Sequence, residues 1–389
     1  MRTRHMFALL AGTALALGLQ PAAAQVVEGA KLGTEEPHTT ITLGEPDPHW
    51  VYVVDPVFPH LIASKVYVVD GDTQEYLGMF NTGYVPNIVL AHDKSGIFTT
   101  ETYWSRGARG ERTDVVTFYD PKTLSPTDEV VLPNGRFLVV PKKQDADLST
   151  DGRYLFSFNM DPSMAVSVVD VKEKRHVADI DLPGCSLVFP TGPKSFVSLC
   201  PDGSFASVSF DESGEAEVEE GQPFFDGEND PVFEHPAMHR PSGQAFFVSY
   251  EGQVFPVELK DGAATHGESW SLLGEADKSE AWRPGGWQLA SFHAATNRLF
   301  VLMHQGGKWT HKHAGAEVWV YDTEKRERIA RVPLEEHAIS VAVTQDDEPL
   351  LFTLSEAASM SVFDATSFEH KGDRGSLGDS PFLLHVFGE

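Results

Sequence analysis

Short hydrophobic runs alternate with polar turns along most of this chain, and the pattern predicts β-strands throughout. Each run is rich in β-branched and aromatic residues and ends at an aspartate, as expected of a buried or half-buried strand closed by a turn. Almost no stretch shows the 3.6-residue period of an amphipathic helix. The runs are Val51–Asp55, Val66–Asp70, Val116–Asp120, Val166–Asp170, Val318–Asp322 and Ser361–Asp364.

A second pattern is a polar turn with Asp, Gly or Asn that leads directly into an apolar strand. It recurs at spacings of roughly 40 to 57 residues, close to the length of a four-stranded propeller blade. Stacking such sheets around a ring buries both faces of each. We therefore expect an all-β fold, a seven-bladed β-propeller of four-stranded antiparallel blades. The copies are Pro46–Tyr52, which is weaker, then His92–Phe98, Thr150–Phe156, Pro201–Phe205, Pro241–Phe247, Ala295–Phe300 and Gln345–Phe352.

Other architectures fit this pattern less well. An α/β fold would need helical periodicity, and a β-sandwich would need fewer strands than the chain supplies. The main rival is an eight-bladed propeller, because blade boundaries are hardest to place between about residues 205 and 240. No linker-like stretch divides the chain after residue 45. We expect one propeller domain over residues 45–389, preceded by an N-terminal arm over residues 25–44.

The segment over residues 1–24 has the pattern of a secretory signal peptide. Arg2 and Arg4 precede an apolar stretch, Met6–Leu19, and the small residues Ala22–Ala24 follow it. The stretch is too short for a spanning helix of about 20 residues, and no later segment is long and apolar enough. We therefore expect cleavage after Ala24 and export, which in a bacterium leads to the periplasm.

Charge and cysteine content limit the partners and the redox chemistry. The formal net charge is −27, and loss of Arg2 and Arg4 with the signal peptide would make it more negative by two. Such a charge repels phosphate backbones and anionic membranes, so we expect neither as a partner. Solubility alone explains the charge, with an acidic docking face as the alternative. The two cysteines, Cys185 and Cys200, are expected to form a structural disulfide in an oxidising compartment.

The sequence assembles no catalytic constellation by itself. The densest histidine cluster is His311-Lys312-His313 with His304 upstream, and it lacks the three or four ligands of a stable metal site. We interpret it as a solvated loop pair and expect no metal. No nucleophile elbow, zinc-binding histidine helix or P-loop occurs. The segment Asp55–Leu61 lies between two predicted strands, where Phe58 would suit either an interface or the local core.

Three segments resemble the heavy subunits of methylamine and aromatic amine dehydrogenases. They are Arg109-Gly110-Glu111-Arg112-Thr113-Asp114 with the strand after it, Trp282-Arg283-Pro284-Gly285-Gly286-Trp287-Gln288 with His293, and the region from Cys185 to Cys200. Matches extend from about residue 45 to the end of the sequence, in the expected order.

This resemblance implies a function in which the reactive cofactor is on another chain. Such enzymes contain two large propeller subunits and two small, disulfide-dense subunits that carry tryptophan tryptophylquinone. A primary amine is oxidised to an aldehyde and ammonia, a catalytic aspartate of the small subunit takes a proton, and electrons pass to a cupredoxin such as amicyanin or azurin. With two cysteines, this chain cannot be the small subunit, and no catalytic residue is assigned to it.

The resemblance also assigns a role to Phe58, because a phenylalanine at the corresponding loop position lines the substrate channel of the family. The preferred amine stays open. Val57–Leu61, Trp270–Leu273 and Thr310–Lys312 look like the aromatic-amine branch, whereas Gly110–Asp114 and Arg283–Gln288 look more like the methylamine branch. Two other classes of function are alternatives: a free-standing propeller hydrolase, such as a metal-dependent lactonase, and a cofactor-free binding scaffold.

Overall fold

The computed structural model describes residues 41–389. By its internal contacts the chain divides after Ile41, and the compact unit Thr42–Glu389 contains every helix and strand given below. The predicted signal peptide (residues 1–24) and most of the predicted arm (residues 25–44) lie outside the described residues. No helix in the described part of the chain is long and apolar enough to cross a membrane.

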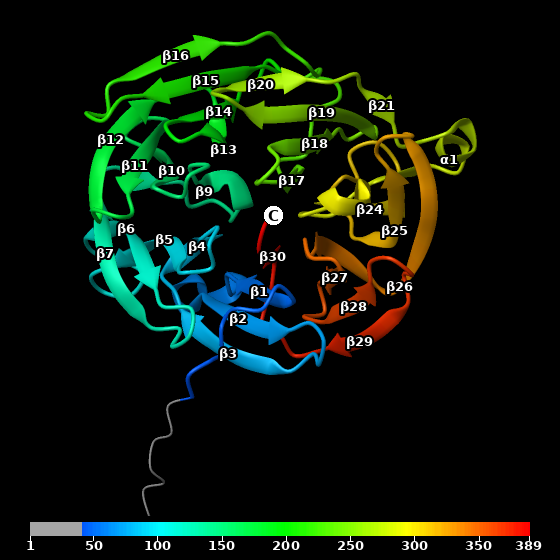
Figure 1. Cartoon of the computed structure of the whole chain (residues 1–389), viewed down its shortest axis with the longest axis horizontal. Coiled ribbons are helices and arrows are strands. Elements are labelled where there is room, and N and C mark those ends of the chain that lie inside the picture. Colours follow the sequence, from blue (N-terminus) through cyan, green and yellow to red (C-terminus); the bar gives the residue numbers. More distant parts are fainter. Residues whose placement is uncertain (1–40) are drawn as a thin grey trace, which may run out of the picture. The chain divides into compact units, whose positions relative to one another are not determined.

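The unit Thr42–Glu389 is an all-β propeller in which antiparallel sheets surround a central axis (Figure 1). The first sheet, in pairing order, contains β30 (Leu383–His385), β1 (Trp50–Asp55), β2 (Lys65–Asp70) and β3 (Tyr76–Asn81). The next contains β4 (Tyr84–Leu90), β5 (Ile97–Trp104), β6 (Arg112–Tyr119) and β7 (Pro126–Leu132). In the third, β8 (Gly135–Arg136) and β9 (Ala146–Leu148) both pair with β10 (Tyr154–Asp161), followed by β11 (Ala165–Asp170) and β12 (Arg175–Asp181).

The remaining strands continue around the ring. The fourth sheet contains β13 (Ser186–Gly192), β14 (Ser195–Leu199), β15 (Phe205–Phe210) and β16 (Ala216–Glu220). The fifth contains β17 (Ala237–His239), β18 (Gln244–Val248), β19 (Gln253–Lys260), β20 (Ala263–His266) and β21 (Trp270–Ser271). The sixth contains β22 (Trp282–Pro284), β23 (Ala290–His293), β24 (Arg298–Gln305), β25 (Gly315–Asp322), β26 (Glu327–Val343), β27 (Leu350–Ser355), β28 (Met360–Asp364) and β29 (His370–Arg374). The described helices are short: α1 (Glu275–Ser279) and the 3-10 turns η1 (Phe58–Ala63), η2 (Lys143–Asp145) and η3 (Ala294–Thr296).

The number of separate blades differs from the predicted seven. Five sheets of four or five strands form separate blades, and the sixth sheet has eight strands. The reason is β26, which runs for 17 residues without a break. Its residues 327–333 pair with β25, and its residues 338–343 pair with β27. A turn expected between two sheets is therefore replaced by a continuous strand.

Both faces of the inner strands are covered by neighbouring sheets, which explains their continuous apolar runs. Successive side chains of a strand point to opposite faces. In β1, Val51 and Val53 pack in a cluster with Phe352 of β27, whereas Tyr52 and Val54 pack with residues of β4 and β5 on the other side. All six residues of β1 are buried. An alternating polar and apolar pattern is absent from β1 because neither face meets water.

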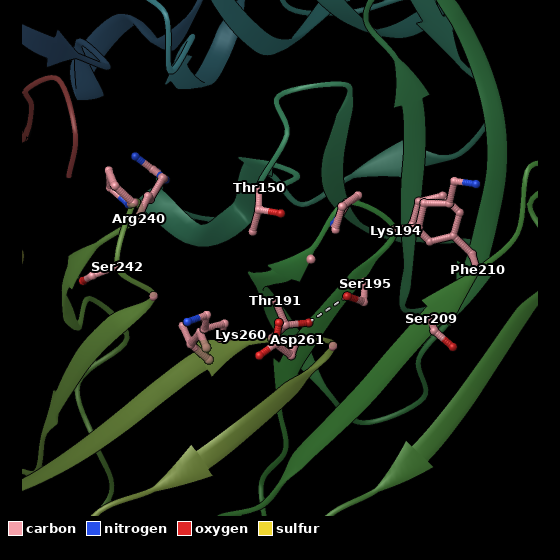
Figure 2. Close-up of a pocket in the computed structure, with 16 residues that line it drawn as sticks. Thr150, Thr191, Lys194, Ser195, Ser209, Phe210, Arg240, Ser242, Lys260 and Asp261 are labelled. Atoms are coloured by element: carbon pink, nitrogen blue, oxygen red, sulfur yellow. Dashed lines mark hydrogen bonds between the residues drawn. The ribbon is translucent and has the colours of Figure 1, made fainter.

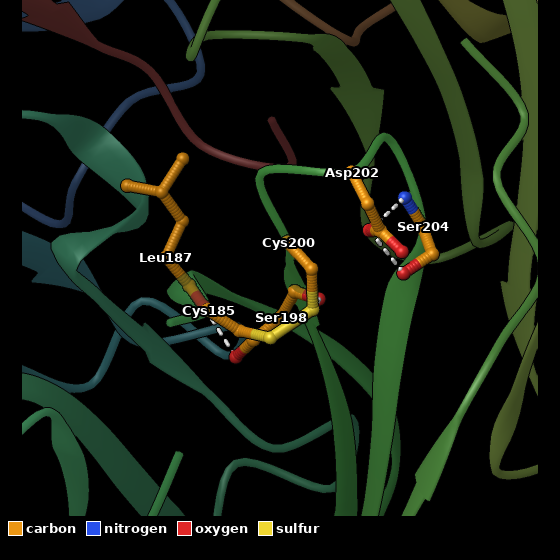
Figure 3. Close-up of a disulfide and its surroundings, with 6 residues drawn as sticks. All are labelled: Cys185, Leu187, Ser198, Cys200, Asp202 and Ser204. Atoms are coloured by element: carbon orange, nitrogen blue, oxygen red, sulfur yellow. Dashed lines mark hydrogen bonds between the residues drawn. A yellow bond between two sulfur atoms is a disulfide. The ribbon is translucent and has the colours of Figure 1, made fainter. Parts of the chain in front are cut away.

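The predicted disulfide is present between Cys185 and Cys200 (Figure 3). It joins the segment before β13 to the end of β14, and both cysteines are buried. Closing a loop of 15 residues restricts the unfolded chain and stabilises the fold by about 3 kcal/mol in the chain-entropy account. The described residues contain no free cysteine.

Candidate functional site

The loop between β1 and β2 carries Phe58 and is held in place by the buried aspartate that ends β1. The Asp55 carboxylate accepts hydrogen bonds from the backbone N–H groups of Val57 (2.9 Å), Asp379 (2.9 Å) and Ser380 (3.1 Å). Val57 has a left-handed backbone, with φ 48°, which is costly for a β-branched residue. Three hydrogen bonds to one carboxylate offset this strain and fix the start of η1.

Phe58 lies at the surface, and neighbouring residues hold both its backbone and its ring. Its backbone N–H donates to the Ser380 hydroxyl at 2.8 Å. Its side chain is 40% exposed, and its ring meets the edge of Phe382 with centroids 4.9 Å apart and planes at 89°. This T-shaped contact fixes one face of the ring and leaves the rest accessible. Phe58 is therefore partly packed and partly exposed. This is intermediate between a residue of the local core and a fully exposed interface residue.

Phe382 extends the contact to Trp287, so that three rings form a continuous row. The rings of Phe382 and Trp287 lie 4.9 Å apart, and the Lys312 ammonium lies 4.6 Å from the centre of the Trp287 ring. We call Phe58, Phe382 and Trp287 the aromatic row. Its members come from three loops that are far apart in the sequence, and Lys312 adds a cation–π contact at its end.

Close backbone packing places Trp287 in this row. Gly286 has φ 124°, and a Cβ there would lie 2.9 Å from the carbonyl oxygen of Ile339, so only glycine fits without a shift. The Trp287 N–H donates to that same carbonyl at 2.6 Å, and its indole N–H donates to the carbonyl of Pro141 at 3.2 Å. Gly286 of the Trp282–Gln288 segment thus has a direct structural purpose.

A second aromatic group joins the loop between β24 and β25, which contains Lys312, to Tyr250 in the turn between β18 and β19. The rings of His311 and Tyr250 stack at 3.9 Å with planes at 15°. Trp309, in the same loop, is 55% exposed, and its ring meets Tyr250 edge-on at 6.2 Å. Tryptophan and tyrosine are typical anchor residues of protein interfaces.

The His311-Lys312-His313 segment is a loop, as predicted. His311 stacks on Tyr250, and the ring of His313 lies 5.6 Å from that of His304. Within residues 41–389, no group of three or more His, Cys, Asp or Glu residues is arranged to hold a metal ion. These histidines take part in aromatic packing.

A buried histidine, His235, lies next to Trp287. His235 is buried and accepts a hydrogen bond on Nε2 from the Lys143 N–H at 3.2 Å, while Nδ1 lies 3.0 Å from the Trp287 carbonyl. Burial, aided by the charges of Lys143 and Lys142, lowers the pKa of His235 to about 3. Burial likewise raises the pKa of Asp145 to about 7. The neutral ring of His235 packs against Trp287, with the two ring centroids 5.6 Å apart.

The Arg109–Asp114 segment has a structural role in the fold. The Arg112 guanidinium bonds to the Asp114 carboxylate at 2.7 Å and donates to the carbonyl of Arg136 in β8 at 2.7 Å. The buried Arg136 in turn donates to Asn87 and to backbone carbonyls of β4. The segment therefore joins two adjacent sheets.

Phe58 was predicted from the sequence as a candidate site residue, but the residues that hold its ring in place were not predicted. Trp287 was noted only as part of a family segment, while Phe382 and Trp309 were not singled out. An aromatic residue in a predicted loop was the available signal for Trp309, which sits between Gly-Lys and Thr-His. Contacts between loops that are far apart along the chain, as between Phe58 and Phe382, leave no mark in a single sequence.

Fold and site together define a β-propeller with an aromatic row and an exposed tryptophan among the described residues, the residue types enriched at protein interfaces. The family model for methylamine dehydrogenase heavy chain matches residues 47–387. The heavy chain of Methylobacillus flagellatus is 35% identical over 380 residues, covering 97% of this chain and 95% of the relative. That of Paracoccus versutus is 35% identical over 342 residues, covering 87% and 79%. The chain therefore belongs to the methylamine dehydrogenase heavy chain family.

Solved structures with low sequence identity share the fold alone. A dihydro-heme d1 dehydrogenase superposes with a TM-score of 0.56 at 17% identity, covering 90% of this chain and 78% of that chain. The hydrazine synthase of Kuenenia stuttgartiensis gives 0.53 at 14% identity, covering 87% and 99%. Membership of the heavy-chain family indicates a large subunit of an amine dehydrogenase, and a heavy chain implies a light-chain partner.

Proposed function

We propose that this chain is the large subunit of a periplasmic, tryptophan tryptophylquinone-dependent amine dehydrogenase. The complex would contain two large and two small subunits. It would convert a primary amine and water to an aldehyde and ammonia. This oxidation would release two electrons and two protons. A cupredoxin would accept the electrons. The observation that carries the proposal is the family match over residues 47–387.

The tryptophans of this chain do not suit a quinone cofactor. This supports the proposal that the cofactor belongs to the small subunit. In the described residues one pair of tryptophan rings lies close together, Trp282 and Trp319, at 5.1 Å. Both are buried, and the Arg331 guanidinium covers them at 4.6 and 4.9 Å. An amine could not reach either ring without displacing this arginine.

The proposed contribution of this chain is to bind the small subunit and to shape the substrate entrance. When bound in its own subunit, the quinone supplies the two-electron acceptor for the amine. The aromatic row and Trp309 offer apolar area and rigid anchors for that subunit. Phe58, held by Asp55 and Phe382, would narrow the entrance, contact the side chain of the amine and exclude water.

Purification of the tagged full chain from cells that make it tests the proposal. A small, cysteine-rich, quinone-bearing chain should co-elute, and the complex should oxidise a primary amine with an artificial electron acceptor. The chain produced alone should show neither quinone absorbance nor amine oxidation. Activity of the lone polypeptide would refute the subunit assignment, and so would a complex without a quinone. N-terminal sequencing should begin at Gln25 if the signal peptide is cleaved as proposed.

A further inference from the structure

A two-part cavity lies on the turns that precede β10, β14 and β18. Its outer part is an open groove of about 690 Å³ that contains Lys194, Arg240 and Lys260 (Figure 2). Its inner part is a smaller chamber of about 150 Å³. Thr150, Arg240 and Leu259 line both parts, so the groove leads into the chamber past these residues. The aromatic row contributes no residue to either part.

The inner chamber is mainly apolar. Its walls are formed by side chains of β9, β13, β17 and β19, which contribute Leu148, Pro190, Met238 and Leu259. The ring of His92 closes one side and is held by a 3.0 Å contact between Nε2 and the Ser149 carbonyl. A cavity on the order of 150 Å³ lined by apolar side chains has room for a molecule the size of benzene.

Arg240 is the fixed polar group at the junction of groove and chamber. Its Nε lies 2.9 Å from the buried carboxylate of Asp147, and its Nη1 donates to the main-chain oxygen of Glu389. Two of its three nitrogens are thereby held, and Nη2 has no protein acceptor among the described residues. The remaining nitrogen, Nη2, can donate a charge-assisted hydrogen bond to a carboxylate oxygen.

The groove carries charges of both signs, since Asp261 lines it together with Lys194 and Lys260. Lys194 forms an ion pair with Glu212, whereas Lys260 has no ion-pair partner in the part of the chain that the structure describes. The hydroxyls of Ser195 and Ser242 also line the groove. The donors without an acceptor among the described residues are therefore Nη2 of Arg240 and the Lys260 ammonium.

We propose that this cavity binds a small monocarboxylate with an apolar body about the size of a benzene ring. The carboxylate would bond to Nη2 of Arg240, and the apolar body would occupy the chamber between Leu148, Met238 and Leu259. The inference is independent of the proposed dehydrogenase activity, because it rests on the chamber and on Arg240.

Titration of the purified full chain with benzoate tests the proposal, using 4-fluorobenzoate and fluorine NMR as the readout. Saturable binding is expected with a dissociation constant on the order of 1 mM or lower, given the few atoms of the ligand. Benzamide, which has the same shape without the charge, should bind at least tenfold more weakly. Absence of saturable binding, or equal affinity for benzoate and benzamide, would overturn the proposal.

Two variants locate the site. Thr150→Trp places a large ring at the junction from an exposed loop position and should reduce benzoate affinity at least tenfold, whereas Thr150→Ser should leave it unchanged. Arg240→Lys keeps a positive charge but loses the planar donors, so it should weaken benzoate binding and leave benzamide unaffected. Because Arg240 also contacts buried Asp147, the melting temperature of each variant is measured alongside. Wild-type affinity in a folded Thr150→Trp variant would place the binding elsewhere and refute the assignment.

Discussion

Phe58 shows how far one residue can be assigned from sequence. Its place in a loop followed from the strands on either side, and its channel role followed from the family resemblance. The structure adds that the ring is 40% exposed and rests edge-on against Phe382. Neither the exposure nor the partner could be predicted, because both depend on a loop near the opposite end of the chain.

Replacing Phe58 by alanine in the assembled complex should alter substrate selectivity more than stability. Removing the ring widens the proposed entrance, so relative kcat/KM for phenylethylamine against methylamine should change by about 10 to 200-fold. A fully buried phenylalanine would instead cost about 3 to 5 kcal/mol of unfolding free energy. Ile62→Ala is the matched control, since Ile62 lies on the same 3-10 turn and is 52% exposed. Unchanged selectivity together with a large fall in melting temperature would contradict the channel role.

The lowered pKa of the buried His235 ring predicts that the folded chain loses stability in acid. Burial and the nearby lysines lower its pKa from 6.5 to about 3 in the folded chain. The unfolded chain therefore binds more protons below pH 6.5. The contribution of the neutral ring is complete above pH 6.5 and is lost as the pH falls toward 3. The slope for one such group is at most about 1.4 kcal/mol per pH unit.

Urea unfolding at pH 7.5, 6 and 5 measures this effect. The His235→Gln variant should be less stable at pH 7.5, because the Lys143 and Trp287 backbone groups lose well-placed partners, but it should lose less stability on acidification. His60→Gln serves as the control because His60 is exposed. An unchanged pH slope in His235→Gln would show that other groups control the acid sensitivity; His304, whose pKa burial lowers to about 4, is the next to examine.

At the scale of elements, the aspartates that end the strands explain why the sequence pattern was informative. Five of them each accept hydrogen bonds from the backbone N–H groups two and three residues later, and the residue four positions on adopts a left-handed backbone. The side chain thus builds the turn that follows its strand. These aspartates are Asp70, Asp120, Asp170, Asp322 and Asp364.

Asp120→Ala should therefore destabilise the turn between β6 and β7. Two backbone N–H groups, of Lys122 and Thr123, lose their acceptor, at a cost of about 1 to 2 kcal/mol in unfolding free energy. Asp120→Asn should recover most of the loss, since the amide oxygen can accept the same bonds. Asp347→Ala, at an exposed position, is the control. Equal effects of Asp120→Ala and Asp347→Ala would show that the turn does not need its aspartate.

The second sequence pattern was less reliable. The copy at Pro201–Phe205 leads from β14 into β15, whereas the copy at Pro241–Phe247 leads from β17 into β18. These turns therefore occupy different positions within their sheets. An Asp-Gly turn reports only that the chain reverses, not which pair of strands it joins. The same limit explains the blade count, because β26 continues through Pro333 and changes its partner from β25 to β27 without a turn.

For the whole molecule, the sequence predicted the class of fold but not how the ring closes. Closure depends on β30, a three-residue strand that pairs with β1 through Tyr52, Val53 and Val54. So short a strand has no detectable period. Its position is fixed by Gln288, whose side chain donates to the Leu384 carbonyl at 2.9 Å and accepts from the Leu384 N–H at 2.9 Å.

Gln288→Ala should loosen this closure. It leaves the buried Leu384 N–H without its side-chain acceptor, at about 1 to 3 kcal/mol of unfolding free energy, while the Leu384 carbonyl keeps the Lys143 ammonium at 3.1 Å. Amide hydrogen exchange of β1 and β30 should accelerate more than that of β24, which is paired on both sides. Gln305→Ala, at an exposed side chain, is the control. Uniform acceleration across all sheets would indicate global destabilisation rather than opening at the closure.

The pairing of β1 with β30 also has a consequence for the order of events during biosynthesis. The first strand of the ring pairs with a strand that is synthesised near the end of the chain. While the ribosome is still adding residues, β1 has a free edge, and the sheets beside it lack a closed ring to pack against. The native ring can form only once residues 383–385 have been synthesised, so the edge of β1 stays unpaired until a late stage of synthesis.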